Sequence, residues 1–269
     1  MAMQPSATPI MMSQSRVLQS KLAVVILNWN LPEDTITCIE SLGSAAGRDM
    51  QIIVVDNGST DDSVMRFRQH FGSAVTLVQN GSNLGFAAGV NVGIERALAD
   101  GAEYVLLLNN DTIVASDMID RLLSAASAQP RAGVVAPVIY YHDEPQRIWR
   151  YADKQYRWFP VPMQCSPSAL EGVNDPFHVD YVTGCGVLIS RAVFEAIGGF
   201  DARYVMYFED ADFCRRARAA GFEIWCVPQA RMWHKVSLSA QKDKPASRYA
   251  QSWGRAHFYR QHPHGPFAC

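Results

Sequence analysis

A short polar run follows an apolar stretch near the middle of the chain, and its side chains could bind a divalent cation. Residues 104–108 read Tyr-Val-Leu-Leu-Leu and are followed directly by Asn109, Asn110 and Asp111. Open α/β sheets bind ligands beyond the carboxyl ends of their strands, where a carboxylate can hold a metal ion against a diphosphate. The same residue types also begin loops or cap helices, because they hydrogen-bond nearby backbone. The run therefore indicates either a nucleotide-sugar site or an ordinary polar turn.

Two earlier apolar runs, at residues 22–27 and 51–55, end in a similar way. The three polar strand ends are Asn28-Trp29-Asn30, Asp56-Asn57-Gly58-Ser59 and Asn109-Asn110-Asp111. Because the carboxyl ends of parallel strands meet at one edge of a sheet, these side chains are predicted to converge on one cleft. The sequence lacks both the GxGxxG turn of dinucleotide-binding folds and a GxxxxGK[ST] loop. Phosphate groups bound in this cleft are therefore expected to need a metal ion.

A second acidic cluster lies further along the chain, at Glu209, Asp210 and Asp212. The spacing of apolar residues places these acids at the start of a helix, and the preceding helix is predicted to begin at Ser190 and end at Gly198-Gly199. Carboxylates in a first turn interact favourably with the helix dipole, which would explain them without catalysis. Alternatively, one of them acts as a general base.

Strands and helices alternate four times before the acidic cluster. The strands are expected at residues 22–27, 51–55, 75–78 and 104–108, with amphipathic helices between them. Asp34 is predicted to cap the first helix, and Ser59 with Asp62 to form a capping box at the second. Such alternation predicts an α/β fold, Rossmann-like, with a mostly parallel central sheet flanked by helices.

The composition is that of an ordinary globular protein, with 269 residues of which 48% are hydrophobic and 19% charged. The six cysteines form no CxxC pair and several lie in apolar stretches, which is typical of buried thiols in a reducing compartment. Residues 1–20 lack the apolar core of a signal peptide, and no apolar run is long enough to span a membrane. We therefore expect a flexible tail at 1–20 and a cytoplasmic protein.

The end of the chain is basic and aromatic. The formal net charge is −2, yet residues 231–260 carry seven Lys or Arg against one Asp. A helix is predicted there, with Tyr249, Trp253 and Phe258 among its aromatic residues. Such a helix could contact the inner face of a membrane peripherally or pack back on the rest of the protein.

Taken in order, these motifs resemble the inverting glycosyltransferases of family 2, which have the GT-A fold. The resemblance rests on residues 24–30, 56–61, 83–93, 109–111, 198–201 and 207–212. Together these segments span most of residues 22–234. Within the family, they are most similar to bacterial rhamnosyltransferase-like enzymes that build cell-surface polysaccharide.

The resemblance implies roles for residues on the nucleotide side. Asp56 would accept a hydrogen bond from the pyrimidine N–H, with a simple helix cap as the alternative. Asp111 matches the last carboxylate of the DxD motif, which binds the Mg²⁺ or Mn²⁺ that bridges the two phosphates. Asn109 stands where the first Asp would be, so one charge is missing, and His234 matches a histidine that completes metal or diphosphate binding. The residues expected to bind nucleotide-sugar are Asn28, Asn30, Asp56, Asn83, Gly85, Asn109, Asn110 and Gly184.

On the acceptor side, the resemblance implies that Asp210 is the general base and that Glu209 supports it. Asp210 would take the proton of the acceptor hydroxyl as that oxygen attacks the anomeric carbon from behind, which gives inversion. The implied donor is a UDP- or dTDP-linked sugar, and the implied acceptor is a saccharide or a polyprenyl-linked saccharide; no nucleic acid is involved. Two alternatives stay open, a sugar nucleotidyltransferase and a non-catalytic nucleotide-sugar or carbohydrate-binding protein.

One GT-A catalytic domain is expected at residues 21–234, with a nucleotide-binding half at about 21–115 and an acceptor-side half at about 116–234, followed by a C-terminal segment at 235–269. The acceptor-side half contains an irregular excursion between residues 142 and 180, rich in proline and aromatic residues. These rings could stack on acceptor sugar or form a small core. Thr183-Gly184-Cys185-Gly186 closes the excursion and is predicted to line the donor-sugar pocket.

Overall fold

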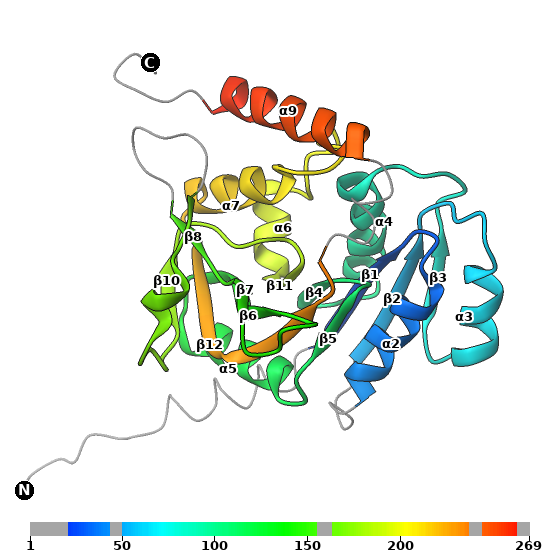
Figure 1. Cartoon of the computed structure of the whole chain (residues 1–269), viewed down its shortest axis with the longest axis horizontal. Helices are drawn as coiled ribbons and strands as arrows, with labels where there is room; N and C mark the ends of the chain where they lie inside the picture. The colour runs from blue at the N-terminus through cyan, green and yellow to red at the C-terminus, as the bar shows by residue number, and fades with distance from the viewer. Residues whose placement is uncertain (1–20, 44–49, 155–162, 237–243, 263–269) are drawn as a thin grey trace, which may run out of the picture.

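The computed structural model describes residues 21–43, 50–154, 163–236 and 244–262. Its centre is a ten-stranded sheet with helices packed on both faces (Figure 1). The expected tail at residues 1–20 lies outside the described residues. Within the described ranges, none of the helices has the length and apolar character needed to cross a membrane.

The first part of the chain builds a parallel half-sheet. Its strands are β1 (Leu22–Asn28), β2 (Met50–Asp56), β3 (Thr76–Gln79) and β4 (Tyr104–Asn109). They lie in the order β4-β1-β2-β3, with Asn28 opposite Asp56 and Leu27 opposite Asn109. The four predicted strands are therefore confirmed to within one residue at each boundary, and their three polar ends meet at one edge.

The second part of the chain extends the same sheet on the other side of β4. The added strands are β5 (Thr112–Val114), β6 (Ala132–Tyr141), β7 (Ile148–Arg150), β10 (Phe177–Val179), β11 (Gly186–Ser190) and β12 (Glu223–His234). β11 is antiparallel to both β4 and β6, whereas β12 is parallel to β6. Two short strands, β8 (Asp153–Lys154) and β9 (Met163–Gln164), pair separately, and η2 (Pro167–Leu170) is a 3₁₀ turn.

Helices cover both faces of the sheet because its strands are apolar on both sides. One face packs against α4 (Phe86–Ala99), α6 (Arg191–Ile197) and α7 (Glu209–Ala219). The other face packs against α2 (Pro32–Leu42), α3 (Ser63–Phe71) and α5 (Met118–Ala128). The alternation along β1 shows this directly, since Val25 faces the first layer and Val24 and Ile26 face the second.

Two helix starts differ from the predictions. α2 begins at Pro32, whose fixed φ suits the first helical position, so Asp34 lies inside the first turn and is not the cap. α3 begins at Ser63 and has no capping box, because Ser59 Oγ already accepts hydrogen bonds at the end of β1. Asp61 Oδ1 instead accepts a hydrogen bond from the Ser63 backbone N–H. The predicted helix after Ser190 is confirmed as α6.

The excursion between residues 142 and 180 contains β7 to β10 and part of the core. Tyr151 is buried and contacts Phe177 edge-on, with ring centroids 6.3 Å apart. Three aromatic residues of the excursion lie outside the described residues, namely Tyr156, Trp158 and Phe159. The described rings therefore form a small core at Tyr151, while Trp149 reaches the cavity described below.

The predicted C-terminal helix is present as α9 (Lys244–Gln261). It lies across α7 and the segment that precedes it (Figure 1). Phe258 is fully buried and its ring lies 5.8 Å from that of Phe208. One side of α9 thus packs back on the protein, whereas Tyr249 and Tyr259 are exposed. Contact of this exposed side with a membrane stays a prediction.

Candidate active site

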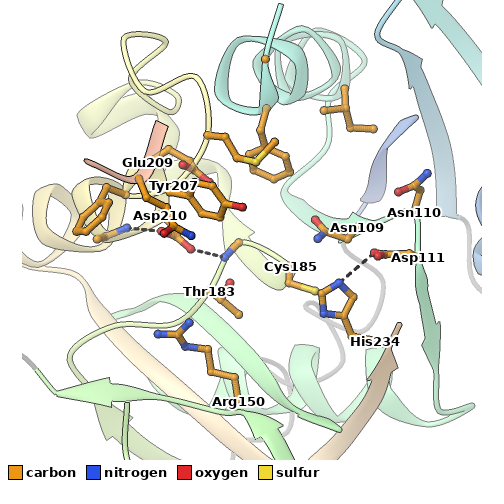
Figure 2. A pocket seen from close by; sticks show the side chains of 18 of the residues that line it. Asn109, Asn110, Asp111, Arg150, Thr183, Cys185, Tyr207, Glu209, Asp210 and His234 are labelled. Carbon is orange, nitrogen blue, oxygen red and sulfur yellow. Dashed lines mark hydrogen bonds and ion pairs between the residues drawn. The ribbon is translucent and has the colours of Figure 1, made fainter. Parts of the chain in front are cut away.

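A cavity of about 440 Å³ opens at the carboxyl edge of the parallel half-sheet. Its walls come from the ends of β1, β2, β4 and β12, from the starts of α4 and α7, and from α9. Figure 2 shows Asp111 and His234 facing each other on one side, with Asp210 on the other. All three line the same cavity, as the sequence interpretation required.

The backbone brings Asp111 and His234 together although they are far apart in sequence. β5 pairs antiparallel with the end of β12, which sets His234 opposite Thr112, and the Lys235 N–H donates to the Asp111 carbonyl at 3.0 Å. His234 Nε2 lies 3.0 Å from Asp111 Oδ1. The two residues are 5% and 7% exposed, respectively, so this contact is nearly closed to bulk water.

The pair offers one carboxylate and one imidazole to a cation. His234 Nδ1 is buried and has no hydrogen-bond partner in the described part of the chain, and the Trp149 ring packs edge-on against the imidazole at 4.6 Å. Burial raises the pKa of the nearby Cys185 thiol well above its usual value, so this sulfur stays protonated and is a poor ligand. Among the described residues, no group of three or more His, Cys, Asp or Glu could hold a metal ion, so protein would supply two such ligands.

The predicted nucleotide residues at the ends of β1 and β2 are mostly buried behind the cavity wall. Asn28 is 0% exposed, and its amide donates to Asp56 Oδ1 at 3.0 Å and to Ser59 Oγ at 3.0 Å. The Asn28 side-chain oxygen accepts from Thr35 Oγ1 at 2.8 Å. Asn30 has a left-handed φ of 54°, and its side-chain oxygen accepts from the Thr60 N–H at 2.8 Å. Asn28, Asn30 and Asp56 are absent from the cavity lining.

The other predicted nucleotide residues line the cavity. They are Asn83, Gly85, Asn109, Asn110 and Gly184. The Asn110 amide donates to Thr35 Oγ1 at 3.0 Å, which links the end of β4 to the network at the end of β1.

Asn57 was not singled out from the sequence but organises this wall. Its amide donates to Asn83 Oδ1 at 3.0 Å and to the Gly85 carbonyl at 3.1 Å, while its oxygen accepts from Asn80 and from the Leu84 N–H. The only sequence signal was its place directly after Asp56. Asn57 thus joins the end of β2 to the loop that begins α4.

Asp210 lies in the first turn of α7, as predicted, with its carboxylate bonded by three donors. Oδ2 accepts from the Tyr181 hydroxyl at 2.6 Å and from the Gly184 N–H at 3.2 Å, and Oδ1 accepts from the Ala211 N–H at 2.9 Å. Tyr181 was missed in the sequence, because a tyrosine inside an irregular stretch has no motif of its own. Gly184 had been expected to contact the donor sugar, and in the structure its backbone also contacts Asp210.

Glu209 precedes Asp210 but has very different surroundings. Its side chain is buried, and Oε2 has no hydrogen-bond partner among the described residues. Burial, together with the neighbouring Asp210 charge, raises the pKa of Glu209 well above its usual value. The two residues before it, Tyr207 and Phe208, both have left-handed φ values, of 70° and 72°. This costly backbone places two adjacent carboxyl groups at the cavity.

Several further cavity residues were not among the predicted site residues. They are Trp149, Arg150 and Asp153 from the excursion, Phe86 and Tyr207, and Gln251 and Arg255 from α9. The excursion was recognised as aromatic, and α9 as basic, but neither pattern says which side chains turn inward.

Residues 23–198 match the family model described as Glycosyl transferase family 2. The chain belongs to glycosyltransferase family 2. A second model, described as the N-terminal domain of galactosyltransferase, matches residues 168–238, which include Asp210 and His234. The family 2 assignment agrees with the order of motifs in the sequence.

Among curated proteins, the chain is similar to rhamnosyltransferases. N-acetylglucosaminyl-diphospho-decaprenol L-rhamnosyltransferase of Mycobacterium tuberculosis is 31% identical over 245 residues, which cover 79% of this chain and 75% of that protein. Rhamnosyltransferase WbbL of Escherichia coli is 27% identical over 200 residues, covering 68% and 72%. The dTDP-rhamnosyl transferase RfbF of Shigella flexneri is 21% identical over 230 residues, covering 84% and 72%.

Solved structures show the GT-A glycosyltransferase fold for this family 2 member. A mannosyltransferase from Pyrobaculum calidifontis, in complex with GDP-Man and Mn²⁺, has a TM-score of 0.62 at 18% identity and matches 91% of this chain and 66% of its own. GalNAc-T7, with UDP, GalNAc and Mn²⁺, has a TM-score of 0.65 at 16% identity, with coverage of 80% and 43%. The chain thus spans under half to two thirds of these two neighbours.

Proposed function

We propose that this family 2 protein is an inverting glycosyltransferase that moves rhamnose from a dTDP-linked donor to a saccharide carried on a polyprenyl diphosphate, in polysaccharide biosynthesis. The observation that supports a transferase is the single cavity with the Asp111–His234 pair on one side and Asp210 on the other. The names of the three curated relatives support rhamnose, and one of them names a lipid-linked acceptor.

Asp210 is the proposed general base. Its carboxylate lines the cavity and points Oδ1 at a single backbone donor, which leaves that oxygen able to accept a further proton. The acceptor hydroxyl would lose its proton to Asp210 as its oxygen forms the new bond to the anomeric carbon. The bond to the diphosphate oxygen breaks on the opposite side of that carbon, and this single displacement inverts it.

Asp111 and His234 are the proposed ligands of a divalent metal ion, Mg²⁺ or Mn²⁺. One carboxylate oxygen and one imidazole nitrogen, 3.0 Å apart on the cavity wall, are a donor set that suits such a cation. A cation bound there would neutralise charge on the departing diphosphate. Asn109 adds a neutral side chain where relatives of the DxD type carry a second charge, so the residues rely on the substrate phosphates for further oxygen ligands.

Asp56 is the proposed partner of the pyrimidine N–H, and Asn28 is its positioning residue. The fully buried Asn28 amide fixes Asp56 Oδ1, and the Ser59 N–H fixes Oδ2 at 3.1 Å. Recognition of the base through Asp56 requires the nucleotide to approach over Asn30, the half-buried neighbour of this network. Asn57 would hold the adjoining loop around Asn83 and Gly85.

The decisive experiment measures transfer by the full chain from dTDP-rhamnose and from UDP-hexoses to an N-acetylglucosaminyl-diphospho-polyprenol, with manganese and with a chelator. We expect transfer from dTDP-rhamnose that the chelator abolishes. Asp210→Asn should lower kcat by roughly 10²- to 10⁴-fold, because the amide cannot take the proton, while donor binding measured by calorimetry is unchanged.

Asp175→Asn is the control for this variant, because Asp175 is an exposed carboxylate outside the cavity. It should leave kcat at the wild-type value. Near wild-type transfer by Asp210→Asn would show that another group is the base. Binding of the donor without any transfer or hydrolysis would favour a binding protein instead.

A further inference from the structure

The two oxygens of the Asp210 carboxylate have different surroundings. Oδ2 accepts two hydrogen bonds, from the Tyr181 hydroxyl at 2.6 Å and from the Gly184 N–H at 3.2 Å. Oδ1 accepts one, from the Ala211 N–H directly after it in the chain. Oδ2 is therefore committed to the protein, whereas Oδ1 has capacity for one more partner.

The polarity of the Tyr181 hydrogen bond is fixed. The Tyr181 side chain is buried, and burial followed by the Asp210 charge raises the pKa of this phenol well above its usual value. The hydroxyl therefore keeps its proton at any pH at which the protein works. A carboxylate can only accept, so Tyr181 donates to Asp210 throughout.

Tyr181 is held in place by Arg150 and Asp153 of the excursion. The Tyr181 carbonyl accepts from the Asp153 N–H at 3.0 Å, which forms an isolated bridge between the two segments. Arg150 lies over the ring at 5.7 Å and donates to both oxygens of Asp153 at 3.0 and 2.5 Å. Arg150, Asp153 and Tyr181 all line the cavity with Asp210. The excursion thus presents a rigid hydroxyl to the acidic start of α7.

We propose that Tyr181 is a positioning residue for the reaction: it holds Asp210 Oδ2 so that Oδ1 alone faces the acceptor hydroxyl. This inference rests on the proposed role of Asp210 as the base. During transfer, the acceptor O–H bond breaks, its proton goes to Oδ1, and its oxygen forms the bond to the anomeric carbon as the diphosphate leaves. Asp210 ends as a neutral acid and returns the proton to solvent after product release.

Removal of this hydrogen bond is expected to change how Asp210 acts as a base. A donor that stabilises the ionised carboxylate lowers its affinity for a proton, so removing the donor raises that affinity. The other titratable or charged groups that interact with Asp210 are Glu209 on α7, Arg150 on β7, Asp153 on β8, and the thiols of Cys185 and Cys214. Tyr181→Phe leaves all of these side chains in place and removes the hydrogen bond from the phenol to Asp210 Oδ2.

Tyr181→Phe tests this proposal through the pH dependence of kcat/KM. We expect the acidic limb of the profile to move to higher pH by about one unit, kcat on the plateau to fall about tenfold, and the KM for the sugar donor to stay within about twofold. Replacement of Tyr181 by 3-fluorotyrosine keeps the ring and makes the hydroxyl a stronger hydrogen-bond donor. The acidic limb of the profile should then move to lower pH. This second variant retains the packing and so answers the question even where Phe destabilises the fold.

Tyr151→Phe is the matched control. Tyr151 is also buried in the excursion, and its hydroxyl donates to the Ser166 carbonyl at 2.9 Å. The Tyr151→Phe variant loses one buried hydroxyl that donates to a backbone carbonyl and not to a carboxylate. Its pH profile should therefore superimpose on that of the wild type. The proposal is wrong if Tyr181→Phe and 3-fluorotyrosine also leave the acidic limb in place. A profile that stays in place while Asp210→Asn is inactive rejects only the role of Tyr181, whereas an active Asp210→Asn rejects the base itself.

Discussion

At the residue scale, two adjacent carboxyl groups have very different surroundings. Asp210 is stabilised by a hydroxyl and two backbone N–H groups. Glu209 is buried with one oxygen unpartnered, and its pKa is raised well above its usual value. Environments that separate neighbouring titratable groups in this way are typical of acid–base sites. We infer that Glu209 is neutral in the folded protein.

Glu209→Gln tests the state of this buried carboxyl through stability. A raised folded-state pKa means that the stability contributed by Glu209 is fully present below its unfolded value of 4.5 and is lost as pH rises through the folded pKa. Glutamine has no charge to acquire. The difference in Tm, variant minus wild type, should therefore become more positive as pH rises from 4.5 toward neutrality, as measured by calorimetry at several pH values.

Glu95→Gln is the control, because Glu95 is an exposed residue of α4. Its difference in Tm should not change with pH over the same interval. A flat or falling difference for Glu209→Gln would show that Glu209 is charged in the folded protein.

At the element scale, the strand ends and the turns after them build one wall of the cavity. The β3–α4 connection depends on Gly85, which has φ 81° and ψ 178°, a conformation essentially limited to glycine. A Cβ at this position would lie 2.8 Å from the Val205 carbonyl oxygen, which also accepts from the Phe86 N–H at 2.8 Å. The start of α4 is thus fastened to the segment that leads into α7.

Gly85→Ala should therefore disturb both stability and transfer. We expect a loss of about 3 kcal/mol in the free energy of unfolding, from backbone strain and from overlap with Val205. The kcat should fall as well, because the displaced segment continues into Glu209 and Asp210. Denaturant unfolding and the transfer assay measure the two effects.

Gly81→Ala is the matched control for Gly85. Gly81 also has a positive φ, of 71°, but a Cβ there meets nothing within 4 Å. It should cost about 1 kcal/mol from backbone strain alone and leave kcat unchanged. Equal losses in the free energy of unfolding for Gly85→Ala and Gly81→Ala would show that overlap with Val205 does not contribute to the loss at Gly85.

At the scale of the whole molecule, the C-terminal helix completes the wall of the cavity beside the start of α7. Gly254 allows α9 to approach the left-handed segment, since a Cβ there would lie 2.8 Å from the Tyr207 carbonyl oxygen. His262 Nε2 lies 2.7 Å from Asp212 Oδ1 on α7. Gln251 and Arg255 reach the cavity from the same helix. α9 therefore supports the strained residues that carry Glu209 and Asp210.

Phe258→Ala tests this support. Phe258 is 1% exposed and packs on Phe208, so its loss should lower the free energy of unfolding by about 3–5 kcal/mol. The kcat should fall together with stability, because Phe208 directly precedes the acidic pair. Urea unfolding and the transfer assay provide the two measurements.

Tyr259→Ala is the neighbouring control on the exposed side of α9, where Tyr259 is 40% exposed. The Tyr259→Ala variant should change the free energy of unfolding by no more than about 0.5 kcal/mol. If Phe258→Ala left kcat unchanged while lowering stability, α9 would be a structural helix with no influence on the site.

The amino-acid sequence by itself determined the parallel half-sheet, its three polar strand ends and the acidic start of α7. These features follow from short-range periodicity and from residues adjacent in the chain, such as Asn109, Asn110 and Asp111 after β4. The two wrong helix caps, at Asp34 and Ser59, were also local predictions. The cap at Asp34 failed because the helix already begins at Pro32. The cap at Ser59 failed because its hydroxyl accepts hydrogen bonds from Asn28 and Asn30 instead.

Only the tertiary structure decided which distant side chains meet. The approach of His234 to Asp111 depends on the pairing of β5 with β12, and the bond from Tyr181 to Asp210 depends on the excursion folding back onto α7. The docking of Phe258 on Phe208 has the same character. Such contacts are set by strand register and by packing over long sequence separations, and no local pattern of residues encodes them.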